Sequence, residues 1–175
     1  MPPTMSRQRC GRTSAPAMSR SCRCIGDPIG ATAWRLGETQ FAHRLIDAGI
    51  DIVHGHSSHH PRPIEIYRGK PILYGCGDVI DDYEGIGGHE SYRPDLRMLY
   101  LISIDPGRDE LASLRMLPLR VRRMRLERIS QTDVEWLRAT LEHISRRFEI
   151  DFVTAPDEQL AVRPRRATTR THPHR

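Results

Sequence analysis

Residues 51–78 read DIVHGHSSHHPRPIEIYRGKPILYGCGD, and this stretch predicts both the fold and the site. The β-branched run at 50–53 predicts a buried strand that ends at Gly55, because a short apolar run bounded by glycine is typical of one. A second apolar run follows at 71–74. In layered α/β proteins, functional side chains commonly lie in the loops just past such strand ends. We therefore expect the site in the loops after these two strands.

Four of the nine histidines lie directly after the first predicted strand. Imidazole binds zinc, manganese and iron, and several imidazoles close together can hold a divalent ion. A glycine followed by His-x-x-His at a strand end is more specific than a lone histidine, although it is weaker than a paired-cysteine zinc motif. The alternative is an ordinary solvated loop, which applies best to the histidine before Pro61. The four are His54, His56, His59 and His60.

A longer pattern surrounds these histidines. It consists of FAH at 41–43, LIDAG at 45–49, DIV at 51–53, GHSSH at 55–59, EIYRGK at 65–70 and ILYGCGD at 72–78. The pattern resembles the bacterial capsule-synthesis family CapA, also called the poly-gamma-glutamate capsule biosynthesis family, which is related to calcineurin-like metallophosphoesterases. Ser58 stands where the family usually has proline, and Asp78 stands where it has asparagine, which indicates a divergent branch. The resemblance covers about residues 38–150 and only the C-terminal part of such a protein.

The resemblance implies an α/β fold, namely a partial, mixed-sheet, layered structure from the C-terminal portion of a four-layer α/β sandwich. It also implies metal-dependent phosphoester hydrolysis in capsule or poly-gamma-glutamate synthesis, with an anionic or phosphorylated substrate. Divalent Mn, Fe or Zn ions would be the cofactors, and His56 and His59 would be their ligands. Asp78, His54 and His60 are candidates for substrate binding. Because a two-metal site needs more ligands than two histidines, we expect this chain alone to retain no metal and to be inactive.

Two other functions stay open from composition and charge. The first is a non-catalytic module that binds metal or an anionic polymer through histidines and arginines. The second is nucleic-acid binding, suggested by the formal net charge of +5 at pH 7. We expect no nucleic-acid partner, because the arginines crowd into the tails and residues 120–128 with few aromatic residues between them. We also expect a cytoplasmic protein, since no apolar run approaches the ~18 residues of a membrane span and no secretory signal is present.

Composition divides the chain into three parts. Residues 1–37 lack helical or strand periodicity, so we expect an irregular segment. A shifted reading frame would explain it: codons for residues 21–32 can be chosen so that another frame reads VSVHWGSNWGY, and the resemblance places a strand ending in His-Trp-Gly here. Residues 38–154 are expected to form the CapA-like domain. Residues 155–175 are expected to be a disordered polar tail.

Periodicity within residues 38–154 predicts the main elements. A helix over 37–48 should end at Gly49, and a second helix should begin after a Ser130 cap, with Asp133 three residues later. Arg68-Gly69-Lys70 should turn a hairpin. Four further strands are expected at 98–104, 111–117, 119–126 and 148–153, with the arginines of the third on a solvated sheet edge. We expect apolar surface left bare where further strands of a complete fold would lie. The acidic loop at 78–90 supplies further candidate ligands.

Overall fold

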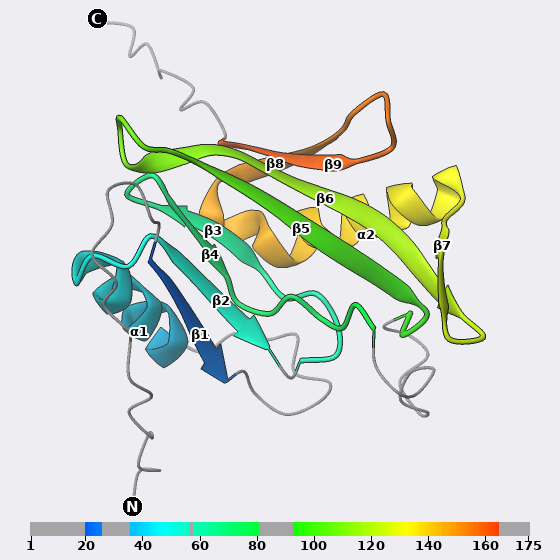
Figure 1. The fold of residues 1–175 in the computed structure, drawn as a ribbon, viewed down its shortest axis with the longest axis horizontal. Coiled ribbons are helices and arrows are strands. Elements are labelled where there is room, and N and C mark those ends of the chain that lie inside the picture. Colours follow the sequence, from blue (N-terminus) through cyan, green and yellow to red (C-terminus); the bar gives the residue numbers. More distant parts are fainter. Residues whose placement is uncertain (1–19, 26–35, 57, 81–92, 165–175) are drawn as a thin grey trace, which may run out of the picture.

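The computed structural model describes residues 20–25, 36–56, 58–80 and 93–164, which form two β-sheets and two α-helices (Figure 1). The first sheet contains β1 (Ser21–Ile25), β2 (Ile52–His56), β3 (Ile64–Tyr67) and β4 (Lys70–Leu73). The second contains β5 (Leu96–Asp105), β6 (Glu110–Arg122), β7 (Arg125–Arg128), β8 (Ile150–Thr154) and β9 (Leu160–Pro164). The helices are α1 (Leu36–Asp47) and α2 (Gln131–Ser145), and a 3-10 turn at Arg146–Phe148 follows α2.

The first sheet is mixed and has the strand order β1-β2-β4-β3. Strands β1, β2 and β4 are parallel, and β3 is antiparallel to β4. Helix α1 packs on one face, where its Ala42 and Ile46 contact a core that includes Val53 and Ile72. The predicted helix and hairpin are therefore confirmed, and the first strand ends at His56, one residue past the predicted end at Gly55.

The second sheet is antiparallel, with the order β5-β6-β9-β8 and β7 paired to the outer part of β6. Helix α2 lies against one face of this sheet, where Leu141 and Met116 are completely buried. Ile64 and Leu73 of the first sheet join the same core, so α2 and both sheets pack together. The predicted α/β class is confirmed, and the described residues form two sheets. The four-layer sandwich stays a prediction.

The expectation of an irregular segment over residues 1–37 is wrong for Ser21–Ile25. These residues form β1, which pairs in parallel with β2 so that Ile25 lies opposite His56. A strand therefore lies where the resemblance places one ending in His-Trp-Gly, but here it reads SCRCI. The composition gave no sign of it because the open edge of β2 supplies its hydrogen-bonding partner. The other residues of the proposed frameshifted segment up to residue 35, apart from Arg20, lie outside the described residues.

Two further expectations about strands need correction. The predicted strand at 119–126 is a hairpin instead, because β6 ends at Arg122 and β7 begins at Arg125. Its two turn residues, Arg123 and Met124, have φ of 49° and 58°, values usually found at Asn or Gly in such turns. The expected disordered tail after residue 154 includes β9, which pairs with both β6 and β8. The strand reads LAVRP, its Leu160 is completely buried in the core, and its pairing with β6 and β8 stabilises it.

Two observations concern the surface of the described part. Leu99 and Leu101 are 41% and 38% exposed, on the face of the second sheet that α2 does not cover. We predicted that apolar surface would be left bare where further strands of a complete fold would lie. Whether Leu99 and Leu101 mark such a place stays a prediction. Helices α1 and α2 have 12 and 15 residues, and no helix in the described ranges is long and apolar enough to cross a membrane.

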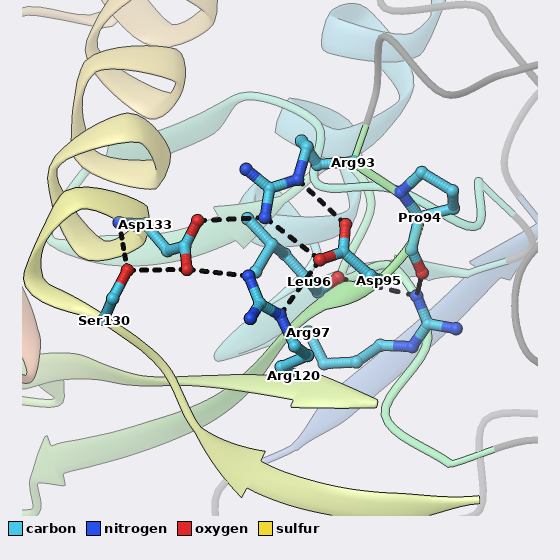
Figure 2. Close-up of polar contacts among 8 residues, drawn as sticks. All are labelled: Arg93, Pro94, Asp95, Leu96, Arg97, Arg120, Ser130 and Asp133. Carbon is cyan, nitrogen blue, oxygen red and sulfur yellow. Dashed lines mark hydrogen bonds and ion pairs between the residues drawn. The ribbon is translucent and has the colours of Figure 1, made fainter. Parts of the chain in front are cut away.

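A polar network holds the start of β5, the middle of the second sheet and the beginning of α2 together (Figure 2). Arg93 donates to Asp95 at 2.9 and 3.0 Å and to Asp133 at 2.9 Å. Arg120 donates to the same two carboxylates at 3.1 and 2.7 Å. The predicted cap is confirmed, since Ser130 Oγ accepts from the Asp133 amide at 3.2 Å and donates to its carboxylate at 2.8 Å.

This network should make the fold sensitive to acid. Hydrogen bonding and charge from Arg93 lower the pKa of Asp95 despite its partial burial. Burial alone would raise the pKa of Asp133, but hydrogen bonds from Ser130 and Arg93 lower it. A carboxyl whose pKa is lowered by folding stabilises the protein above its unfolded pKa of about 3.9, and this stability is lost as the pH falls. We expect the free energy of unfolding, measured with urea, to decrease as the pH drops below about 4.

The control for this expectation is the double variant Asp95→Asn and Asp133→Asn. It should unfold more easily at neutral pH and show a shallower dependence on acid, because these two carboxyls no longer titrate. An equally steep acid dependence in the variant would assign the effect to other groups.

Candidate functional site

The candidate site lies at one edge of the first sheet, just past the ends of β2 and β4. Because these strands are parallel neighbours, their carboxyl ends meet at the same edge. The segment 58–60 follows β2, and the segment 74–78 follows β4. The backbone joins the two segments: Cys76 N–H donates to the Gly55 carbonyl at 3.2 Å, and Arg62 N–H donates to the Gly75 carbonyl at 2.9 Å.

Two of the predicted site residues are in direct contact. His59 Nδ1 lies 2.9 Å from Asp78 Oδ2, although the two are 19 positions apart. Their side chains are 27% and 18% exposed, so a ligand could still reach them. His59 has a φ of 57°, a left-handed conformation that non-glycine residues adopt rarely. A carboxylate on one ring nitrogen fixes the orientation and the tautomer of an imidazole, which is the usual support for a metal-binding or proton-transferring histidine.

Two glycines allow the loops to approach each other this closely. A Cβ at Gly55 would overlap the carbonyl oxygen of Tyr74 and lie 2.8 Å from its carbonyl carbon. A Cβ at Gly75 would lie 2.6 Å from Ser58 Oγ and 2.8 Å from the Arg62 side chain. Ser58 is almost fully buried and donates to the His60 carbonyl at 2.7 Å, which fixes the turn between the two loop histidines.

The other three predicted site residues occupy different surroundings. His54 and His56 are half-buried at alternate positions of β2, so they share one face of the sheet. His54 lies opposite Leu73 in the pairing with β4, and His56 lies opposite Ile25 in the pairing with β1. His60 is buried, which contradicts the alternative of a solvated residue at that position. Whether these side chains share a ligand with His59 stays a prediction.

The donors present do not complete the metal site that the resemblance implies. Across the described ranges, no group of three or more His, Cys, Asp or Glu side chains has an arrangement that could hold a metal ion. Burial raises the pKa of the Cys76 thiol to about 11, so at neutral pH it is not the thiolate that binds metals. The candidate ligands of the acidic loop from 81 to 90 lie outside the described residues. The predicted divalent metal is thus a hypothesis that needs further donors.

A buried polar cluster on the α1 side of the sheet was not predicted. His43 Nε2 lies 2.8 Å from Glu65 Oε1, and the Tyr74 hydroxyl donates to Glu65 Oε2 at 2.5 Å. The Tyr67 ring stacks on His43 with a centroid distance of 3.6 Å. Burial and the neighbouring carboxylate raise the pKa of Tyr74, so its hydroxyl stays protonated and donates. The cluster fixes α1 to β3 and to the segment that leads to Asp78.

Two buried ion pairs brace the same region. Arg62, only 1% exposed, donates to both carboxylate oxygens of Glu38 at 3.2 and 2.8 Å, which ties the loop after His60 to the start of α1. Lys70 Nζ donates to Asp51 at 2.9 Å. It also lies 2.8 Å from a carboxylate oxygen of Asp109, in the turn between β5 and β6 of the second sheet. Lys70 is the single lysine of the chain and ends the predicted Arg68-Gly69-Lys70 turn, but neither feature predicted these ion pairs.

The fold and the site thus define an α/β protein with a histidine–aspartate pair at the carboxyl ends of parallel strands. Residues 33–83, which include this pair, match the family described as bacterial capsule synthesis protein PGA_cap. This match and the relatives below confirm the predicted resemblance to the CapA family.

Three curated relatives show how much of the chain is shared. Two proteins of Mycobacterium tuberculosis strains, each named "Probable polyglutamine synthesis accessory protein", are 74% identical to it over 128 residues, which is 73% of this chain and 34% of theirs. The "PGA biosynthesis protein CapA" of Bacillus subtilis is 42% identical over 45 residues, which is 26% of this chain and 12% of that protein. The chain spans about a third of the length of the mycobacterial relatives it matches.

Proposed function

We propose that this chain acts in the synthesis of a capsule or cell-surface polymer of the polyglutamate or polyglutamine type. The observation that carries the proposal is the loop pair of β2 and β4, with His59 on Asp78, inside the segment that matches the capsule-synthesis family. The names of its relatives refer to polyglutamine synthesis and to PGA biosynthesis, and the two mycobacterial relatives are similar over most of this chain.

The finer proposal is that the site belongs to a metal-dependent phosphoester hydrolase. His56 and His59 would be two of the metal ligands, and Asp78 would orient His59 through Nδ1. A metal ion in such a site polarises the phosphoryl group and lowers the pKa of a bound water. Two histidines cannot build a two-metal site, so the remaining ligands would have to come from outside the described residues.

A second candidate is a non-catalytic module that binds metal or an anionic polymer. The observation that favours it is β1, a regular strand docked beside His56 where a frameshifted and truncated chain would be irregular. With β1 paired to β2 beside His56, the chain would bind a ligand there without completing a catalytic centre. Aryl phosphate hydrolysis, measured beside metal binding, distinguishes a catalyst from a binding module.

Metal binding by the whole chain tests the site. We expect Mn²⁺ or Zn²⁺, titrated calorimetrically, to bind weakly to the wild type and at least about tenfold more weakly to His56→Ala and His59→Ala, since each removes a ligand. Asp78→Asn should weaken binding less, because it leaves both imidazoles in place and removes only the carboxylate that orients His59. His143→Ala, on the exposed part of α2, is the matched control and should bind like the wild type.

Hydrolysis of an aryl phosphate by the same samples distinguishes the two candidates. Metal-dependent turnover that is lost in His59→Ala supports the hydrolase, and metal binding without turnover supports the binding module. Equal metal affinity in the wild type, His56→Ala and His59→Ala would reject a metal site at these loops. The role in polymer synthesis is tested separately, by measuring the surface polymer of a host that lacks the gene.

A further inference from the structure

The hairpin of β6 and β7 carries a group of arginines that the site does not use. It lies at the end of the molecule opposite α1 (Figure 1). Two arginines at its base have carboxylate partners: Arg120 bonds to Asp95 and Asp133, and Arg128 lies 3.8 Å from Glu158. Because the Arg120 contacts tie β6 to α2 and to the start of β5, the base of the hairpin is held in place.

The outer half of the hairpin holds three exposed arginines without such partners. Arg122 and Arg125 lie directly opposite each other in the antiparallel pair, and Arg123 is the first turn residue. Within the described ranges, no carboxylate forms an ion pair with any of these three. Like charges that face each other across two strands repel and destabilise the pair. A bound anion would relieve this repulsion.

Protection of a sheet edge does not explain this arrangement by itself. Strand β7 is an edge strand, and charged residues on such a strand discourage pairing with another chain. Here the like charges lie on both strands, at positions that face each other, so their repulsion destabilises the pairing of β6 with β7. Conflicts of this kind are expected where a surface is used for binding.

We propose that Arg122, Arg123 and Arg125 form a docking surface for a polycarboxylate chain, which, resting on the proposed function, is the glutamate-type polymer itself. Guanidinium groups match carboxylates in geometry and in charge. An exposed ion pair is weak on its own, but a chain with one carboxylate per residue can engage three arginines together. The hairpin therefore binds polyglutamate, and it binds free glutamate or uncharged polyglutamine far more weakly.

Nucleic acid is the other polyanion to consider, and the composition of the hairpin argues against it. Binding of single strands uses aromatic side chains on which bases stack, and residues 119–128 contain none. Without aromatic side chains, these arginines would bind nucleic acid mainly through its phosphates. A flexible chain of carboxylates needs only exposed positive charges to pair with, and the three arginines of the hairpin supply them.

The test is a titration of the whole chain with poly-γ-glutamate, polyglutamine of matched length, duplex DNA and anionic lipid vesicles at low ionic strength. The hairpin variant combines Arg122→Gln, Arg123→Gln and Arg125→Gln. The charge-matched control combines Arg44→Gln, Arg108→Gln and Arg146→Gln, three exposed arginines on other elements. We expect polyglutamate affinity to fall at least about tenfold in the hairpin variant and to stay within about twofold in the control. Salt should weaken the wild-type interaction, because exposed charges are screened.

Each other outcome overturns the proposal in a specific way. Equal losses in both variants would mean attraction by net charge alone, and equal binding of polyglutamine would exclude carboxylate recognition. Tighter binding of DNA or vesicles than of polyglutamate would assign the surface to a different partner. Thermal unfolding of the hairpin variant at or above the wild-type temperature shows that it is folded, as expected when like charges are removed. The polymer titration does not depend on metal binding at His56 and His59. A negative result for the hairpin would therefore leave the proposed function to be decided by its own tests.

Discussion

Replacing Gly55 with alanine is expected to destabilise the protein by about 3 kcal/mol or more, at the upper end of the cost of overpacking. The new methyl group would overlap the carbonyl oxygen of Tyr74, which is backbone and cannot rotate away. Strand β2 and the segment after β4 would have to separate, which breaks the hydrogen bond from Cys76 N–H to the Gly55 carbonyl. Since His56 follows directly, the site should be displaced along with the strand.

Urea unfolding measures this loss, and Gly37→Ala provides the matched control. Gly37 lies near the start of α1, and a methyl group added there would meet nothing within 4 Å, so alanine should be neutral or slightly stabilising. Metal titration of any folded Gly55→Ala protein should show weaker binding than in the wild type. A Gly55→Ala variant as stable as Gly37→Ala would mean that the two loops are not packed as described.

Replacing Asp133 with alanine is expected to cost about 3 kcal/mol, in the range seen when one partner of a largely buried charge network is removed. The side chain is 11% exposed and accepts from both Arg93 and Arg120, so its loss leaves two cations sharing Asp95 alone (Figure 2). It also removes the hydrogen bond that Ser130 Oγ donates to the Asp133 carboxylate, although the cap bond from the Asp133 amide to Ser130 Oγ is kept.

The matched control is Glu135→Ala, two positions further along α2 on its exposed side. It removes the same charge from the same helix but only a weak 3.3 Å contact with Gln131, so it should change stability by less than about 0.5 kcal/mol. Guanidinium denaturation would mask ionic effects, so urea is the suitable denaturant for both. Equal stability of the two variants would show that the network contributes no more than surface charge.

The sequence by itself determined the elements whose signals are local. Helix α1 follows from its apolar spacing and from Gly49, and α2 begins at Ser130 as its capping pattern predicts. The hairpin at Arg68-Gly69 and the long β5–β6 pair also follow from local patterns of apolar and turn residues. The meeting of His59 with Asp78 was predictable in kind, because parallel neighbouring strands bring the residues after their carboxyl ends together.

Only the tertiary structure decided the features that depend on a distant partner. Strands β1 and β9 have five residues each, too few for a clear local signal, and they form because β2 in one sheet, and β6 and β8 in the other, supply their hydrogen-bonding partners. The network of Arg93, Asp95, Arg120 and Asp133 and the cluster around Glu65 join residues far apart in sequence, so no spacing rule reveals them. Charged residues look alike in a sequence whether they are solvated or paired. The fold distinguishes them, because burying a charge without a partner costs far more free energy than leaving it in water.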